Sequence, residues 1–156
     1  MAQITLWLFV IGLGIDLGAG IYETRIVVPL WANGIPDSLA DGNPYRRVAI
    51  DAGMRFWAYV TSTVAVLALL ALAFGFHVPA PQRVWRMSAA IAELAVVAST
   101  LLYFRPTLVR LFVGHGAGLA SAEVTSIVRR WVLLNRLRIV VSFVAWCAAL
   151  GALALS

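Results

Sequence analysis

Apolar residues dominate four long stretches of the chain, and more polar connections separate these stretches. They run from about residue 4 to 30, 54 to 76, 84 to 104 and 127 to 155. The last helix is expected to begin earlier, at residue 121, because Ser121 followed by Glu123 is typical of a capped helix start. Each stretch is long enough for a membrane-spanning helix, which needs about 20 apolar residues. Lipid cannot satisfy backbone N–H and C=O groups, so each span is expected to be helical. We therefore expect an all-α, integral membrane four-helix bundle of antiparallel up-down topology, with residues 1–156 forming a single domain.

The first stretch is expected to be a spanning helix and not a signal peptide. It has no basic n-region, and its apolar run continues well beyond the length of an h-region. A helix over residues 4–30 would rise about 40 Å, so it must tilt, kink or protrude. Pro29 removes one backbone donor near its end and is expected to interrupt the helix there.

The connections differ in length, which predicts how they are placed. A short turn with two prolines covers residues 77–83, whereas residues 32–53 and 105–120 are longer and rich in glycine. With four crossings, the two longer connections lie at the same end, where we expect them to form a cap. That end also carries more arginines, so the positive-inside rule predicts a cytoplasmic cap and external termini.

Composition supports a membrane location and excludes several classes of site. Hydrophobic residues make up 62% of the chain, and all twelve basic residues are arginines, with a mean hydropathy of +0.91. We assign the net charge of +5 to arginines beside anionic lipid headgroups, not to nucleic-acid binding. Cys147 is the only cysteine, and His77 and His115 fall at opposite ends of the predicted topology. No metal or other cofactor is therefore expected.

Ionisable residues nevertheless occur in or close to the apolar stretches. Such residues are costly in lipid, normally face the bundle interior and often mark a functional site. The six in question are Asp16, Glu23, Arg25, Glu93, Arg136 and Arg138.

Helical spacing predicts which polar side chains share a face. Glu23 and Arg138 lie about two turns inside Trp31 and Trp131 respectively, so we expect them to pair at matching depth. Asp16 and Glu93 lie nearer the middle of the membrane, where they are expected to share a proton or to need an arginine. The predicted inward faces comprise Gly12, Asp16, Ala19, Gly20 and Glu23; Glu93, Thr100 and Phe104 with Tyr103 alongside; and Trp131, Asn135, Arg138 and Ser142. A Gly14–Gly18 pair adds a GxxxG pattern, which predicts close helix packing.

Two interpretations of this polar set remain open. An Arg–Glu pair can simply satisfy the core of a bundle, but the number of inward polar groups favours a site. Trp31 and Trp131 are interpreted as interfacial belt residues, with a lining role in the site as the alternative. The other tryptophans, Trp7, Trp57, Trp85 and Trp146, are interpreted as belt or lipid contacts.

Several of these residues together resemble a known family. The segments are Gly18-Ala-Gly-Ile-Tyr22-Glu23 through Pro29-Leu-Trp31, then Asn43-Pro44, then Trp131-Val-Leu-Leu-Asn135-Arg-Leu-Arg138. They resemble the anthrone-oxygenase-like family of small four-helix membrane proteins, over nearly the whole chain. That family consists mostly of bacterial members of unknown function, and some fungal members oxidise anthrones to anthraquinones.

The resemblance implies a small membrane enzyme, possessing a pocket for a hydrophobic aromatic or polyketide-like molecule and using no cofactor. Oxygenase-type members often carry histidine at the position of Asn135, and asparagine cannot act as a base at neutral pH. Glu23 or Asp16 would then supply the base, and Arg138 would stabilise the oxyanion. The pocket for this ligand would be lined by Tyr22, Trp31, Glu93, Tyr103, Trp131 and Asn135.

Two other functional classes remain open. A carboxylate in the first helix also suits a small proton-coupled transporter of hydrophobic compounds, and a non-catalytic accessory subunit is the third class. Expected partners are membrane lipid, a hydrophobic small molecule and, for an oligomer, further copies of the chain. We expect no nucleic acid partner, and a multi-pass location in the bacterial inner membrane.

Overall fold

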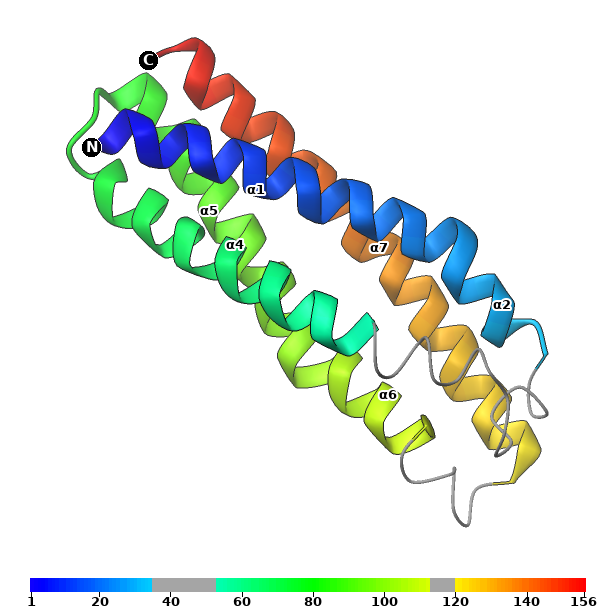
Figure 1. Cartoon of the computed structure of the whole chain (residues 1–156). Coiled ribbons are helices and arrows are strands. Elements are labelled where there is room, and N and C mark those ends of the chain that lie inside the picture. The colour runs from blue at the N-terminus through cyan, green and yellow to red at the C-terminus, as the bar shows by residue number, and fades with distance from the viewer. Residues whose placement is uncertain (35–52, 113–119) are drawn as a thin grey trace.

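The computed structural model describes residues 1–34, 53–112 and 120–156, and these form four long helical segments (Figure 1). The first comprises α1 (Ala2–Tyr22), a π-helical turn η1 (Glu23–Val27) and α2 (Val28–Ala32). The second is α4 (Met54–Gly75). The third comprises α5 (Ala80–Ser99), the π-helical turn η4 (Thr100–Phe104) and α6 (Arg105–Phe112). The fourth is α7 (Ser121–Ala154).

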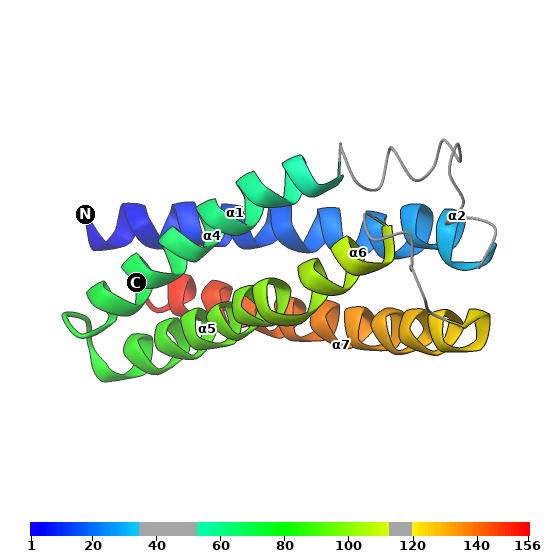
Figure 2. The same ribbon diagram turned by 90° about the horizontal axis from the view of Figure 1, so that it is seen from below.

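These segments form an antiparallel up-down bundle, as predicted. Helix α1 packs against α4 and α7, and α5 packs against the same two helices from the opposite corner. Both termini and the α4–α5 turn lie at one end, and α2 and α6 lie at the other (Figure 1). Away from the α4–α5 turn, α4 diverges from the third helical segment (Figure 2).

The outer surface of the bundle is suited to lipid. All four segments are long and apolar enough to cross a membrane, with mean hydropathies of 1.7 to 2.0 in their most apolar windows. Large apolar side chains such as Ile15, Leu69 and Phe143 are exposed on the outside. The predicted integral, multi-pass membrane protein is therefore confirmed.

Two helix boundaries differ from the prediction because prolines are accommodated. Residues 105–112 were expected in a connection, but they form α6 and extend the third span to Phe112. The first span likewise continues past Pro29 to Ala32. Each proline lies two residues after a π-helical turn, η1 before Pro29 and η4 before Pro106. The altered hydrogen-bond pattern there lets the helix continue through a residue that lacks a donor.

The predicted cap lies largely outside the described residues. Residues 35–52, which include Asn43 and Pro44, and residues 113–119, which include His115, fall in this category.

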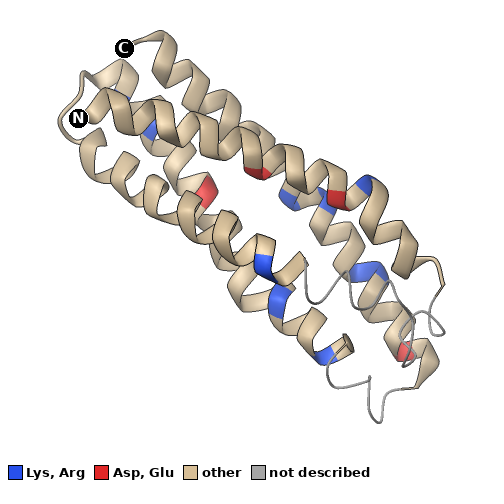
Figure 3. Cartoon of the chain, viewed as in Figure 1, with Lys and Arg blue, Asp and Glu red and all other residues tan. Residues whose placement is uncertain are grey.

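The apolar core is divided into two clusters. One, at the end with the termini, includes Leu6, Phe9 and Leu13 from α1 and alanines from α4, α5 and α7. The other, at the opposite end, contains Trp31, Phe104, Phe112 and Trp131. Between them lies a layer of buried or half-buried polar side chains, which comprises Asp16, Glu23, Glu93, Thr100, Asn135, Arg138 and Ser142. Acidic and basic residues in Figure 3 accordingly gather in the middle of the bundle and toward α2 and α6.

Glycines in the first span allow close packing, although not in the predicted GxxxG pattern. A Cβ atom on Gly14 would lie 3.4 Å from the Trp146 ring, but one on Gly18 would meet nothing within 4 Å. Gly18 points outward, so this half of the predicted contact is wrong. The closest approach is at Gly20, where a Cβ atom would lie 2.5 Å from Ile139 Cδ1.

A candidate site beside the Glu23–Arg138 pair

An ion pair joins the first span to α7 in the polar layer. Arg138 Nη2 lies 3.6 Å from Glu23 Oε2, which confirms the predicted pairing. The other carboxylate oxygen of Glu23 accepts a 3.0 Å hydrogen bond from Trp57 Nε1 on α4. Arg138 Nη1 donates to Thr100 Oγ1 over 3.2 Å. These contacts tie all four helical segments together at one level.

Aromatic rings hold the Arg138 guanidinium from two sides. Its Cζ atom lies 4.8 Å from the centroid of the Phe104 ring and 5.5 Å from that of Trp57. Such cation–π contacts strengthen when water is excluded. Because two of its nitrogens are already engaged, the orientation of the planar guanidinium is fixed.

Two further carboxylic acids lie within electrostatic range of Arg138. Ser142 Oγ donates to Asp16 Oδ2 over 3.4 Å. Glu93 is 1% exposed, and its Oε2 atom has no hydrogen-bond partner among the described residues. Both acids interact electrostatically with Arg138. The polar layer therefore places three acids, counting Glu23, around one guanidinium. A charge-neutral layer requires two of the three to hold protons.

Asn135 lies in the polar layer, between α7 and η1. Its Nδ2 atom donates a 2.9 Å hydrogen bond to Thr24 Oγ1. The side chain is completely buried, and its Oδ1 atom has no partner among the described residues. In this position, Asn135 links two helices and does not line the cavity beside Arg138.

Four aromatic rings, those of Trp31, Phe104, Phe112 and Trp131, pack next to this layer on the side of α2 and α6. Trp131 lies 5.5 Å from both Trp31 and Phe104, centroid to centroid, and Trp31 lies 5.3 Å from Phe112. Trp131 Nε1 donates to the Phe104 carbonyl over 3.4 Å. Trp31 and Trp131 are thus core residues, and their interpretation as interfacial belt residues is wrong.

The π-helical turn η1 explains the position of Trp31. In an uninterrupted α-helix, Trp31 would point about 80° away from Glu23, because each residue advances the helix by about 100°. Residues in a π-helical turn advance it by a smaller angle. η1 therefore rotates Trp31 back toward the face that carries Glu23.

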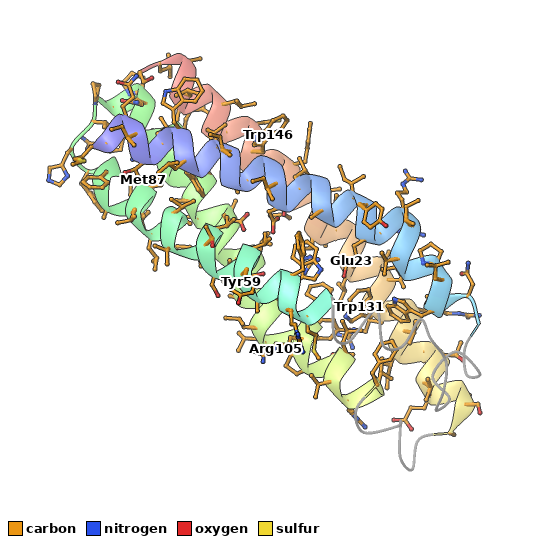
Figure 4. All side chains as sticks on the ribbon, in the orientation of Figure 1. Glu23, Tyr59, Met87, Arg105, Trp131 and Trp146 are labelled. Atoms are coloured by element: carbon orange, nitrogen blue, oxygen red, sulfur yellow. The ribbon has the colours of Figure 1, made fainter. Side chains whose placement is uncertain are left out.

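A cavity of about 330 Å³ adjoins the ion pair. Glu23, Arg138 and Trp57 line it at the level of the polar layer, and Phe104 and Trp131 form an aromatic wall. It extends along α4 and α6 toward Gly53 and Arg105, away from the termini. Figure 4 shows Glu23 and Trp131 in the same half of the bundle, on the first span and α7. The cavity thus combines one carboxylate, Glu23, with three arginines (Arg55, Arg105 and Arg138), three hydroxyl side chains and flat aromatic walls.

Of the nine residues predicted for the site, Glu23, Arg138 and Trp131 line this cavity. Tyr22 does not face inward: it is 61% exposed, because it lies one residue, and hence about 100°, away from Glu23 on the helix. Tyr103 lines a separate hollow on the other side of Arg138. The remaining four, Asp16, Trp31, Glu93 and Asn135, are buried next to the cavity or behind its wall.

Arg25 and Arg136 also depart from the prediction that ionisable residues in the spans face the bundle interior. Both are exposed on the outer surface between the first span and α7.

Three polar contacts were missed from the sequence. The sequence interpretation makes Trp57 a belt residue or lipid contact and gives Thr24 no role. A signal was present for both, because Thr24 adjoins Glu23 and Trp57 lies near the start of α4 at the depth of Glu23. Arg86, also missed, is completely buried at the other end and donates 3.0 Å hydrogen bonds to the Ala71 and Ala2 carbonyls. It ties α5 to α4 and α1, outside the candidate site.

The described residues contain no group of three His, Cys, Asp or Glu side chains that could hold a metal ion. A comparison with protein-family models, curated proteins and solved structures found no match for the chain.

Proposed function

We propose that this membrane protein binds a hydrophobic, aromatic small molecule in the cavity and oxidises it without a cofactor, as anthrone oxygenases do. The observation that carries the proposal is the Glu23–Arg138 pair beside the rings of Phe104 and Trp131 on the wall of the cavity. Ligand pockets typically have volumes of about 300–1,000 Å³, so this cavity suits a small and rigid molecule. The proposed location is the bacterial inner membrane.

In the proposed reaction, a carboxylate of the protein acts as a base and removes a proton from an anthrone. Glu23 takes the proton from the ring CH2 group, and the negative charge moves onto the carbonyl oxygen, where Arg138 stabilises it. Dioxygen then adds to the carbon and forms a hydroperoxide after protonation. Loss of water leaves the second carbonyl, so one anthrone and one dioxygen yield one anthraquinone and one water.

Glu23 is the preferred base in this proposal because it lines the cavity, whereas Asp16 does not. Trp57 would orient the carboxylate through its hydrogen bond to Oε1. The rings of Phe104 and Trp131 offer flat faces against which an aromatic ligand can pack. The apolar outside of the bundle would let such a ligand arrive through the lipid.

The test is an oxygen-consumption and absorbance assay with an anthrone on purified protein. Glu23→Gln is expected to lower the rate by about 100-fold or more, because it removes the base. Arg138→Gln should reduce it similarly. Arg86→Gln is the matched control, because it also changes a buried arginine but lies outside the cavity, and it should retain the rate per folded molecule. Oxidation that survives both site variants would overturn the proposal.

A second candidate, proton-coupled transport of a hydrophobic compound, is favoured by the three acids around Arg138. Buried carboxylic acids that exchange protons are typical of transporters. Proteoliposomes distinguish the two functions. Uptake of an anthraquinone that follows an imposed pH gradient and is lost in Glu93→Gln would favour transport. Turnover of an anthrone without a gradient would favour the enzyme.

A further inference from the structure

The outer surface between the first span and α7 carries three arginines that the candidate site does not use. Arg25 in η1 and Arg129 and Arg136 in α7 are all exposed. No hydrogen bond or ion pair joins any of the three to another described residue. Unpaired arginines in membrane-spanning helices are costly. An anion supplied from outside the described residues would neutralise them.

These arginines line two adjoining hollows, which we name the α1–α7 groove. The first, of about 500 Å³, is lined by Ile21, Thr24, Arg25, Arg136 and Ile139. The second, of about 480 Å³, shares Thr24 and Arg136 and continues past Val132 to Asn33, Thr125 and Arg129. The groove is thus polar toward the start of α7 and apolar toward the middle of the bundle.

This gradient follows the axis of the bundle. Arg129 and Arg136 are seven residues apart on α7, which separates them by about 10 Å along the helix. Arg25 lies opposite Arg136 in the first hollow, and Ile21 and Ile139 lie roughly one turn deeper. A molecule that fits must carry an anion near the arginines and apolar chains beyond them.

We propose that the α1–α7 groove binds an anionic phospholipid, with its phosphate between Arg25 and Arg136 and its headgroup toward Arg129. Basic pockets between membrane-spanning helices recognise such headgroups. The exposed Ile21 and the half-buried Ile139, at the deeper end of the groove, suit the acyl chains. A second copy of the chain fits less well. Asp16, Glu23 and Glu93 are turned inward, and Glu123 is the only exposed acid among the described residues.

Native mass spectrometry of the full chain in detergent tests whether the groove binds an anionic phospholipid. Equal amounts of phosphatidylglycerol and phosphatidylcholine are added to the protein. Wild type should retain phosphatidylglycerol preferentially. Each arginine should raise the ratio of bound phosphatidylglycerol to bound phosphatidylcholine about fivefold. The triple variant Arg25→Gln/Arg129→Gln/Arg136→Gln should lose this preference. The matched control Arg83→Gln/Arg110→Gln/Arg130→Gln removes the same charge from exposed sites elsewhere and should keep it. The single variant Arg136→Gln, which alters both hollows, provides the test if the triple variant does not fold.

Three outcomes would overturn the proposal. Equal retention of both lipids by wild type would show that the charge is not recognised. An equal loss in the control variant would show that only net charge matters. Displacement of phosphatidylglycerol by millimolar inorganic phosphate would identify a site for small soluble anions. The anthrone assay on the triple variant is independent, since these arginines do not line the cavity.

Discussion

Arg138 Nη2 lies 3.6 Å from Glu23 Oε2, so an ion pair joins the middle of α7 to the π-helical turn of the first span. The pair is held further by Trp57 and Thr100, which bind one partner each. Charge, hydrogen bonding and aromatic contact therefore converge on one level of the bundle. Removing Arg138 leaves Glu23 without its ion-pair partner, whereas removing Glu23 leaves Arg138 with Asp16 and Glu93.

This relationship predicts strong coupling between the two residues. Arg138→Ala should lower the free energy of unfolding by about 3–5 kcal/mol, because Glu23 is left as an uncompensated charge. The double variant with Glu23→Ala should be less destabilised than Arg138→Ala alone. Unfolding in mixed micelles, followed by circular dichroism, measures all four members of the cycle. Additive effects of the two single changes would contradict the coupling.

Trp57→Phe should separate hydrogen bonding from aromatic contact. The change removes the Nε1 donor to Glu23 but retains a ring beside Arg138. We expect a loss of about 1.5–3 kcal/mol in the free energy of unfolding, as for other hydrogen bonds to charged groups. Trp7→Phe is the control, because Trp7 is exposed on the outside. Equal effects of the two changes would rule out a specific role of the bond.

Asn135→His tests the position at which the proposed likeness to anthrone oxygenases would favour a histidine. Because Asn135 is completely buried and does not line the cavity, the histidine should not provide a new base there. The anthrone oxidation rate per folded molecule is therefore expected not to rise. An increase of about tenfold or more, which a general base can supply, would place the reaction beside Asn135 and not in the cavity.

Two glycines in the same helix should respond in opposite ways to alanine. Gly18→Ala should stabilise the protein by about 0.4–1 kcal/mol, because its Cβ atom meets nothing and the unfolded chain loses freedom. Gly20→Ala should destabilise it by about 1 kcal/mol or more, because Ile139 Cδ1 must move. Adding Ile139→Val, which removes that atom, should recover most of the loss. Thermal unfolding of wild type and the three variants gives the comparison, and no recovery would show that the crowding lies elsewhere.

The topology predicts that Ala80 and Ser121 lie on opposite sides of the membrane. With Cys147→Ser as the background, a cysteine at each position should react with an impermeant thiol reagent from one side only. Under the positive-inside rule, Ser121 is the cytoplasmic position. Labelling of both positions from the same side would contradict the four-span arrangement.

The helices and the ion pair could be predicted because both depend on local pattern and depth. Four apolar stretches defined the spans, and the distances of Glu23 and Arg138 from Trp31 and Trp131 placed the two charges at one level. Seven-residue spacing correctly put Asp16 and Glu23 on one face.

The errors arise where simple α-helical spacing fails or where a neighbouring helix decides. The π-helical turn η1 rotates Trp31 into the core, and no residue type in that segment predicts a π-helical turn. Arg136 was expected inside, but Asn135 and Arg138 occupy the inward face of α7. The contact of Trp57 with Glu23 depends on how α4 packs against the first span. A single sequence carries no direct information about that packing.

The polar layer lies between two apolar clusters, and the cavity beside Arg138 interrupts the apolar packing toward α2 and α6. Toward the termini the layer is sealed by completely buried side chains, among them Phe9, Leu13 and Ala149. Toward α2 and α6, the cavity leads from Arg138 to Gly53 and Arg105. Proton exchange at Glu23 would therefore follow the pH of a single compartment, even though the acid lies near the middle of the bundle.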